Sequence, residues 1–138
     1  MHRCSKRSIH IGIRCFTAQR IPKICSAHRE RIALGVSNFI NSKNEYLGGA
    51  ISPGIEMKFK ALEHFTSKLP LIEFDKSYNE LIGTNTQNSI LSGVLNGSIA
   101  EIDGLISDYT SNFPDLICIL TGGDSEFLSK RLKNSIFT

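Results

Sequence analysis

Two different spacings of hydrophobic residues follow each other from about Ser37 onward. FINS (residues 39–42), the polar turn KNE and YLGGAIS (residues 46–52) predict two short strands joined by a tight connection, with Asn44 suited to the turn. After Pro53 the apolar residues recur every three or four positions, as in one face of an amphipathic helix, until Pro70 ends the pattern. These positions are Ile55, Phe59, Leu62, Phe65 and Leu69. The charged residues between them predict a solvated face: Lys58, Lys60, Glu63 and Lys68.

A second helical pattern covers the region from about Thr86 to Phe113. Its apolar stripe consists of Leu91, Val94, Leu95, Ile99, Ile102, Leu105, Ile106 and Tyr109. The region is long enough for two helices. Gly93, Gly97 and Gly104 would each weaken an isolated helix by about 1 kcal/mol relative to Ala. They predict either close packing against another backbone or a break near Gly97.

The last part of the chain predicts a buried strand followed by a helix. DLICIL (residues 115–120) is an apolar run, TGGD (residues 121–124) is a glycine turn, and Asp124 or Ser125 is suited to cap the helix that follows. Cys118 is expected to be a buried, small apolar residue. Because helices separate the strands, the pattern predicts an α/β fold.

The N-terminal part has a different composition from the rest. Residues 1–31 hold eight of the sixteen Lys and Arg residues and a single acid, Glu30, whereas the remainder holds eight bases and twelve acids. No hydrophobic period runs through this part, so residues 1–36 are interpreted as a basic leader that is poorly ordered or outside the fold. An organelle transit segment and a nucleic-acid-binding arm are the alternatives. No basic face on a folded element is visible, so nucleic acid is not an expected partner.

Metal and membrane binding are both unexpected. The leader holds three cysteines and three histidines, but none in the close pairs that a zinc site requires. No apolar run approaches the length of a membrane span. We therefore predict no metal ligands and no membrane partner.

Three polar glycine sites are the candidates for ligand binding: LGGAISPG (residues 47–54), GTNT (residues 83–86) and TGGD. Each precedes a helical stretch, where free N–H groups and a closely approachable backbone can hold an anion. Hydroxyl donors would be Ser52, Thr84, Thr86 and Thr121. We expect the amides beside Gly48, Gly83 and Gly122 to converge on one hollow, although tight turns alone would also require these glycines.

The familiar catalytic signatures are absent from the sequence. It contains no G-x-x-x-x-G-K-[ST] phosphate loop, no G-x-G-x-x-G and no G-x-S-x-G elbow. His64, near the first helical stripe, is interpreted as a surface or partly buried residue rather than a catalytic base.

The ordered series YLGGAISPG, KALEHFTSKLP, IGTNTQNSILSG and TGGD, within residues 38–138, resembles the type III pantothenate kinases of the acetate kinase, sugar kinase, Hsp70 and actin superfamily. The resemblance implies that residues 37–138 form a partial C-terminal lobe of ribonuclease H-like (actin-like ATPase) fold, built from a short β-hairpin, helices and a further strand. It also implies ATP-dependent phosphorylation of pantothenate, the first step of coenzyme A synthesis, by a cytoplasmic homodimer that uses Mg²⁺ and K⁺ or NH₄⁺.

The resemblance also implies roles for individual residues. Thr86 would contact pantothenate, Gly122 and Gly123 would lie beside the nucleotide, and Gly48 and Gly49 would line the cleft between lobes. Glu30 and Arg31 stand where the family has the aspartate that acts as catalytic base and the arginine beside it. Glu30 is therefore the candidate base, and Arg31 a candidate substrate contact.

The chain departs from the family pattern in two places. The glycine-rich phosphate loop on the first strand and the Asp-x-Gly-Thr strand are both missing. The chain therefore resembles a fragment of the second lobe, as from a truncated, deleted or frame-disrupted gene, and its activity is expected to be impaired. The alternative is a non-catalytic dimerisation or regulatory module derived from the same fold.

Overall fold

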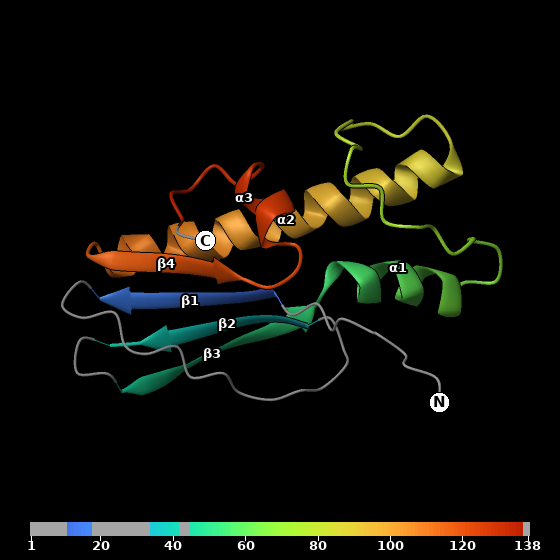
Figure 1. Ribbon diagram of the computed structural model, residues 1–138. Coiled ribbons are helices and arrows are strands. Elements are labelled where there is room, and N and C mark those ends of the chain that lie inside the picture. The colour runs from blue at the N-terminus through green and yellow to red at the C-terminus, as the bar shows by residue number, and fades with distance from the viewer. Residues whose placement is uncertain (1–10, 18–33, 42–44, 137–138) are drawn as a thin grey trace, which may run out of the picture.

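The computed structural model describes residues 11–17, 34–41 and 45–136. In chain order the elements are β1 (Ile11–Thr17), β2 (Leu34–Ile40), β3 (Tyr46–Pro53), α1 (Ile55–His64), α2 (Thr86–Asn112), β4 (Leu116–Thr121) and α3 (Ser125–Ser129) (Figure 1). The strands are interspersed with helices along the chain and include a parallel pair, so the predicted α/β class is confirmed.

The four strands form one mixed sheet in the order β3-β2-β1-β4. β2 and β3 pair antiparallel around a short connection, which confirms the predicted hairpin, and an irregularity in the register lies between Phe39 and Ile40. β1 pairs parallel with β2 and antiparallel with β4, so β3 and β4 are the two edges of the sheet.

One strand lies within the segment interpreted as a leader. Ile11–Thr17 forms β1, an inner strand with neighbours on both sides, and β2 begins at Leu34 rather than near Ser37. The alternation of small, apolar and polar residues in IGIRCFT is too short and irregular to be read as a strand by itself. Hydrogen bonding to strands on both sides stabilises the extended conformation that the local sequence pattern does not predict.

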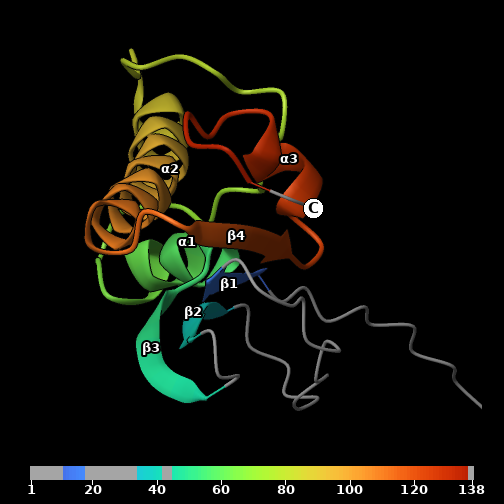
Figure 2. The same cartoon turned by 90° about the vertical axis from the view of Figure 1, so that its left-hand side faces the viewer.

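The helices cover one side of the sheet. α2 crosses above the strands, and α1 lies beyond the end at which β3 finishes (Figures 1 and 2). The core between them draws on α1, α2, β2, β4, α3 and the segment between α1 and α2. Its buried hydrophobic residues are Phe39, Ile55, Phe59, Ile72, Ile90, Leu91, Val94, Leu95, Ile106, Cys118, Leu120, Phe127 and Leu128. The expected burial of Cys118 is therefore confirmed.

α1 is shorter than predicted, whereas α2 covers the predicted region as one helix. α1 ends at His64, although the apolar period runs on to Leu69, because Thr66 donates a hydrogen bond to the Leu62 carbonyl and accepts one from the Leu69 amide, closing the chain into a turn. α2 runs without a break through Gly97. Its apolar stripe packs along its whole length, which outweighs the propensity cost of its glycines.

The glycines of LGGAISPG meet two separate backbone requirements. Gly48 has a φ of 125°, a conformation that other residues rarely adopt. A Cβ on Gly49 would lie 1.8 Å from the carbonyl oxygen of Ser37 on the neighbouring strand. The close contact of β3 with β2 therefore depends on a residue without a side chain.

We expect Gly49→Ala to lower the free energy of unfolding by about 2–4 kcal/mol, because two backbones must separate to admit the methyl group. The matched control is Gly104→Ala, since a Cβ at Gly104 meets nothing within 4 Å. That change should raise stability by about 0.5–1 kcal/mol through helix propensity. Urea unfolding of both variants measures the difference, and a Gly49→Ala protein as stable as the original chain would contradict the requirement.

Candidate functional site: the groove between α1 and α2

A groove of about 780 Å³ runs between α1 and the first turns of α2. α1 and the turn after it form one wall, and α2 forms the other. The lining residues are Lys58, Ala61, Leu62, Thr66, Leu69, Thr86, Ser89, Ile90, Gly93 and Val94. Most of this surface is apolar, with a few hydroxyl groups along it, which is the usual chemistry of a small-molecule site.

A capping side chain and a closely packed loop stabilise the start of α2. Asn85, at the N-cap, accepts a hydrogen bond from the Asn88 amide at 2.8 Å. The loop before it packs so closely on the helix that a Cβ on Gly83 would lie 2.2 Å from the Ser89 nitrogen. The glycine in GTNT thus lets the loop lie against the first turn, and this contact fixes the position of Thr86.

The three hydroxyl groups of the groove differ in how they are bonded. Thr66 donates to the Leu62 carbonyl at 2.6 Å, and Ser89 donates to the Gly83 carbonyl at 3.3 Å. Thr86 is exposed, and its hydroxyl makes no hydrogen bond to the described part of the chain. Thr86 is thus the groove hydroxyl that remains available to a ligand.

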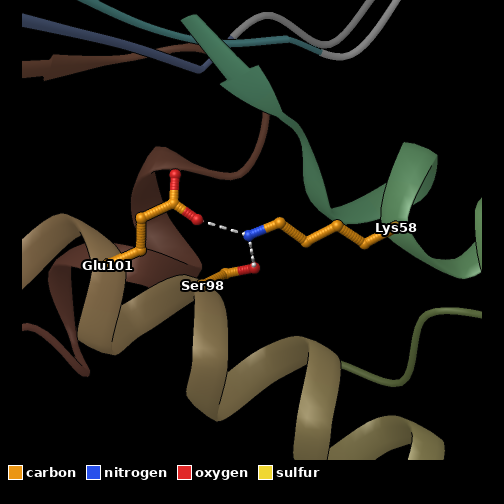
Figure 3. Close-up of polar contacts among 3 residues, drawn as sticks. All are labelled: Lys58, Ser98 and Glu101. Atoms are coloured by element: carbon orange, nitrogen blue, oxygen red, sulfur yellow. Dashed lines mark hydrogen bonds and ion pairs between the residues drawn. The ribbon is translucent and has the colours of Figure 1, made fainter. Parts of the chain in front are cut away.

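Lys58 is the only charged side chain among the described residues that line the groove, and it is neutralised. Its Nζ lies 2.6 Å from Oε2 of Glu101 and donates to Oγ of Ser98 at 3.1 Å (Figure 3). Its side chain is 24% exposed and lies on the groove, so the prediction that Lys58 belongs to a solvated face is wrong. The signal was present in the spacing, because Lys58 stands three residues after Ile55 and four before Leu62, on the apolar side of α1.

The environment of Glu101 lowers the pKa of its carboxyl group. Burial raises the pKa, but the hydrogen bonds from Lys58 and Ser52 and the positive charge of Lys58 outweigh that effect. Glu101 therefore joins the end of β3, α1 and α2 through its contacts. The ion pair neutralises the ammonium charge of Lys58, which would otherwise lie unpaired beside an apolar groove.

The structure does not bring the three glycine sites together. Gly48 on β3 pairs with Phe39 on β2, and the next partners across the sheet are Cys15 on β1 and Cys118 on β4. Gly122 lies beyond Cys118, after Thr121 at the end of β4. Gly48 and Gly122 thus belong to opposite edges of the sheet, three strand spacings or about 14 Å apart in that direction alone. The expected common anion-binding hollow is wrong for this pair.

The remaining predicted site residues are placed as follows. Gly122 has a φ of 117° and, with the exposed Gly123, forms the turn from β4 into α3. Asp124 stands at the N-cap position of α3, but its side chain makes no capping hydrogen bond. Glu30 and Arg31 lie outside the described residues.

Comparison with known proteins tests the family resemblance that the motifs suggest. The sequence model of the family described as type III pantothenate kinase matches residues 36–108. This chain belongs to the type III pantothenate kinase family. The resemblance inferred from the ordered motifs is therefore confirmed.

Individual members of the family give the same result. The chain is 52% identical over 100 residues to the type III pantothenate kinase of Flavobacterium johnsoniae, covering 72% of this chain and 41% of the relative. It is 58% identical over 92 residues to that of Christiangramia forsetii, covering 67% and 37%. It is 50% identical over 99 residues to that of Cytophaga hutchinsonii, covering 72% and 42%. The chain spans about two fifths of the length of these relatives.

We expect the Lys58–Glu101 pair to stabilise the chain above the ordinary glutamate pKa of 4.5 and to lose that effect as the pH falls through the lowered, folded-state value. A double-mutant cycle with Lys58→Met and Glu101→Gln should give a coupling free energy of about 1 kcal/mol at pH 7, which decreases as the pH is lowered through the folded-state pKa of Glu101, below 4.5.

The control for this cycle is the exposed pair Lys60–Glu56, whose Nζ–Oε1 distance is 2.7 Å. The matched substitutions Lys60→Met and Glu56→Gln should show a coupling of only about 0.3–0.5 kcal/mol. Equal couplings for the two pairs at pH 7, or a Lys58–Glu101 coupling that does not decrease as the pH is lowered through the acid range, would contradict the assignment.

Proposed function

We propose that this chain takes part in the ATP-dependent phosphorylation of pantothenate and that pantothenate binds in the groove between α1 and α2. The observation that carries the proposal is that the family match, residues 36–108, includes every residue that lines the groove. The proposed reaction is the one stated in the names of the relatives.

The chemistry of the groove supports this substrate. Pantothenate is a small acid with a branched apolar centre, an amide and two hydroxyl groups. The apolar walls suit the branched centre, and the unbonded hydroxyl of Thr86 can donate to or accept from the polar groups. Thr86 would then orient the substrate, while Leu62, Leu69 and Ile90 exclude water from one side of it.

Phosphate transfer depends mainly on positioning and on neutralisation of charge at the phosphate groups. The family implies ATP as the phosphate donor, and Gly122 and Gly123 remain the predicted contacts to it. Among the residues that the structure describes, no group of three His, Cys, Asp or Glu side chains could hold a metal ion. The roles proposed for these residues therefore include no step through Mg²⁺ or K⁺.

The finer expectations belong to the same proposal. The chain would form a portion of a ribonuclease H-like lobe. Glu30 as the base and Arg31 as a further substrate contact, both outside the described residues, belong to the same proposal. No helix in the described ranges is both long and apolar enough to span a membrane. Cytoplasmic location and impaired activity stay predictions.

The test is the substitution Thr86→Ala. Loss of one neutral hydrogen bond should weaken pantothenate binding about 2- to 10-fold. Titration calorimetry measures the binding directly, and a coupled assay with ATP and pantothenate measures turnover. The calorimetric result stands even if turnover is too slow to detect.

The control is Thr110→Ala, at the other end of α2, where the hydroxyl bonds to the Ile106 carbonyl. This variant should bind pantothenate like the original chain. If Thr86→Ala binds pantothenate as tightly as the original chain and Thr110→Ala do, pantothenate does not bind in the groove as proposed. Turnover that survives Glu30→Ala unchanged would exclude Glu30 as the base.

One observation favours the second candidate, a dimerisation module. Gly93, Gly97 and Gly104 are exposed, and a Cβ on any of them meets nothing within 4 Å. The predicted close packing of these glycines against another backbone is not found within the described residues. A row of glycines on one exposed side of α2 would let a second helix approach closely.

We expect Gly97→Leu to test whether the glycine row of α2 is a dimer contact, which the dimerisation module requires. If α2 packs against a second copy, light scattering should show twice 15.3 kDa for the original chain and a single copy for the variant. Thr110→Leu, away from the glycine row, should leave the mass unchanged. A chain that is monomeric with and without the substitution would exclude the dimerisation module.

A further inference from the structure

A second cavity, of about 320 Å³, lies between the start of α1, the segment after it and the turn into α3. Its lining shares no residue with the groove between α1 and α2. The residues are Glu56, Phe59, Lys60, Leu71, Ile72, Glu73, Phe74 and Asp124. Four apolar side chains thus face a carboxylate that belongs to the far end of the chain.

Asp124 is the unusual member of this set. Its side chain is only 7% exposed, and its Oδ1 has no hydrogen-bond partner within the described residues. Nζ of Lys76 lies 3.1 Å from that oxygen, and its side chain is 53% exposed. A buried carboxylate that does not form its hydrogen bonds costs stability, and its position at the N-cap brings no compensating capping bond.

The same ammonium group also lies near an aromatic ring. Nζ of Lys76 is 5.5 Å from the centre of the Phe74 ring, within the range of a cation–π contact. Phe74 in turn packs at 6.3 Å from Phe59 and edge-on at 5.1 Å from Phe127, so its orientation is held by the core. A carboxylate and a fixed aromatic ring therefore surround one ammonium position.

We propose that this cavity binds a small organic cation, an ammonium group carried on an apolar body, with Asp124 as its counter-ion. The apolar body would lie against Phe59, Ile72 and Phe74. Lys76 occupies the ammonium position when the ligand is absent, and its long exposed side chain swings out to water when the ligand binds.

The charges around the cavity favour a cation over an anion. Of the four charged lining residues, Lys60 is the only base, and it already pairs with Glu56 at 2.7 Å. Glu73 remains as an excess of negative charge, and Asp124 adds to it once Lys76 moves away. An anionic ligand would lie beside these carboxylates in a partly apolar space, which is unfavourable.

The experiment measures binding of phenethylamine to the full chain by titration calorimetry at pH 7. Its neutral analogue, 2-phenylethanol, has the same apolar body without the charge. Phenethylamine should bind at least about 10-fold more tightly than the alcohol, because hydrogen bonds to a charged group are the stronger ones. Equal binding of the two compounds would overturn the proposal.

Two substitutions locate the site. Lys76→Ala removes the competing ammonium and should tighten phenethylamine binding about 2- to 5-fold. Asp124→Asn should weaken it at least about 10-fold while leaving 2-phenylethanol unaffected. The control Lys130→Ala, which breaks an exposed pair with Glu126, should change neither affinity.

Each remaining outcome is also decisive. If Asp124→Asn does not fold by circular dichroism, the Lys76→Ala variant with the charged and neutral ligands still tests the proposal. Failure of phenethylamine to bind Lys76→Ala would overturn it. Competition by ATP with no response to the amine would assign the cavity to a nucleotide instead. None of these results depends on whether pantothenate binds beside Thr86, so the two proposals succeed or fail separately.

Discussion

The unbroken apolar face of α2 is the constraint on which the rest of the structure depends. It buries Ile90, Leu91, Val94, Leu95 and Ile106 against the sheet and the neighbouring helix. The burial of each such side chain contributes about 1.5–3 kcal/mol, which together exceed the cost of three glycines at about 1 kcal/mol each. The helix therefore continues where local propensity alone would allow a break.

The position of α2 also places the polar groups that define the groove. Because the helix is continuous through Gly97, Ser98 and Glu101 stand about one turn apart on the side facing α1. The same helix carries Thr86 at its first turn, and Asn96, further along, accepts a hydrogen bond from Arg131 near α3. Its far end contacts the sheet through Phe113, whose ring centre lies 4.4 Å from that of Phe39. One element thus sets the geometry of the groove and of the chain that follows.

Local rules predicted the parts of the fold that local forces determine. The hairpin, the strand with Cys118 and the extent of α2 follow from strand alternation, an apolar run and a helical apolar stripe. The position of β1 could not be predicted, because it depends on pairing with two distant strands. The early end of α1 depends on one hydroxyl, that of Thr66, which can close a turn against the backbone within an otherwise helical period.

The candidate site was predictable to a smaller degree. Thr86 was predicted as a substrate contact from a motif, and the structure places it on the groove. The partners of Lys58 were not predicted, because they lie 40 and 43 residues further along the chain. A sequence pattern shows which face of a helix a lysine occupies, but not which carboxylate meets it from another element. The same limit applies to Asp124, which looked like a helix cap and is instead a buried carboxylate next to Lys76.

The two ammonium–carboxylate contacts differ in a way that bears on what each region can do. Lys58 meets a carboxylate and a hydroxyl at once, and both ends of that pair are partly buried, so the contact fastens α1 to α2. Lys76 reaches Asp124 from solvent and leaves the Oδ1 atom without a proper hydrogen bond. A lysine whose ammonium group and carboxylate partner both form hydrogen bonds is not easily displaced by a ligand. A buried carboxylate oxygen that lacks a hydrogen bond can instead gain a better donor from a ligand. Structural support and ligand exchange are therefore expected of different pairs, although both join a lysine to an acid.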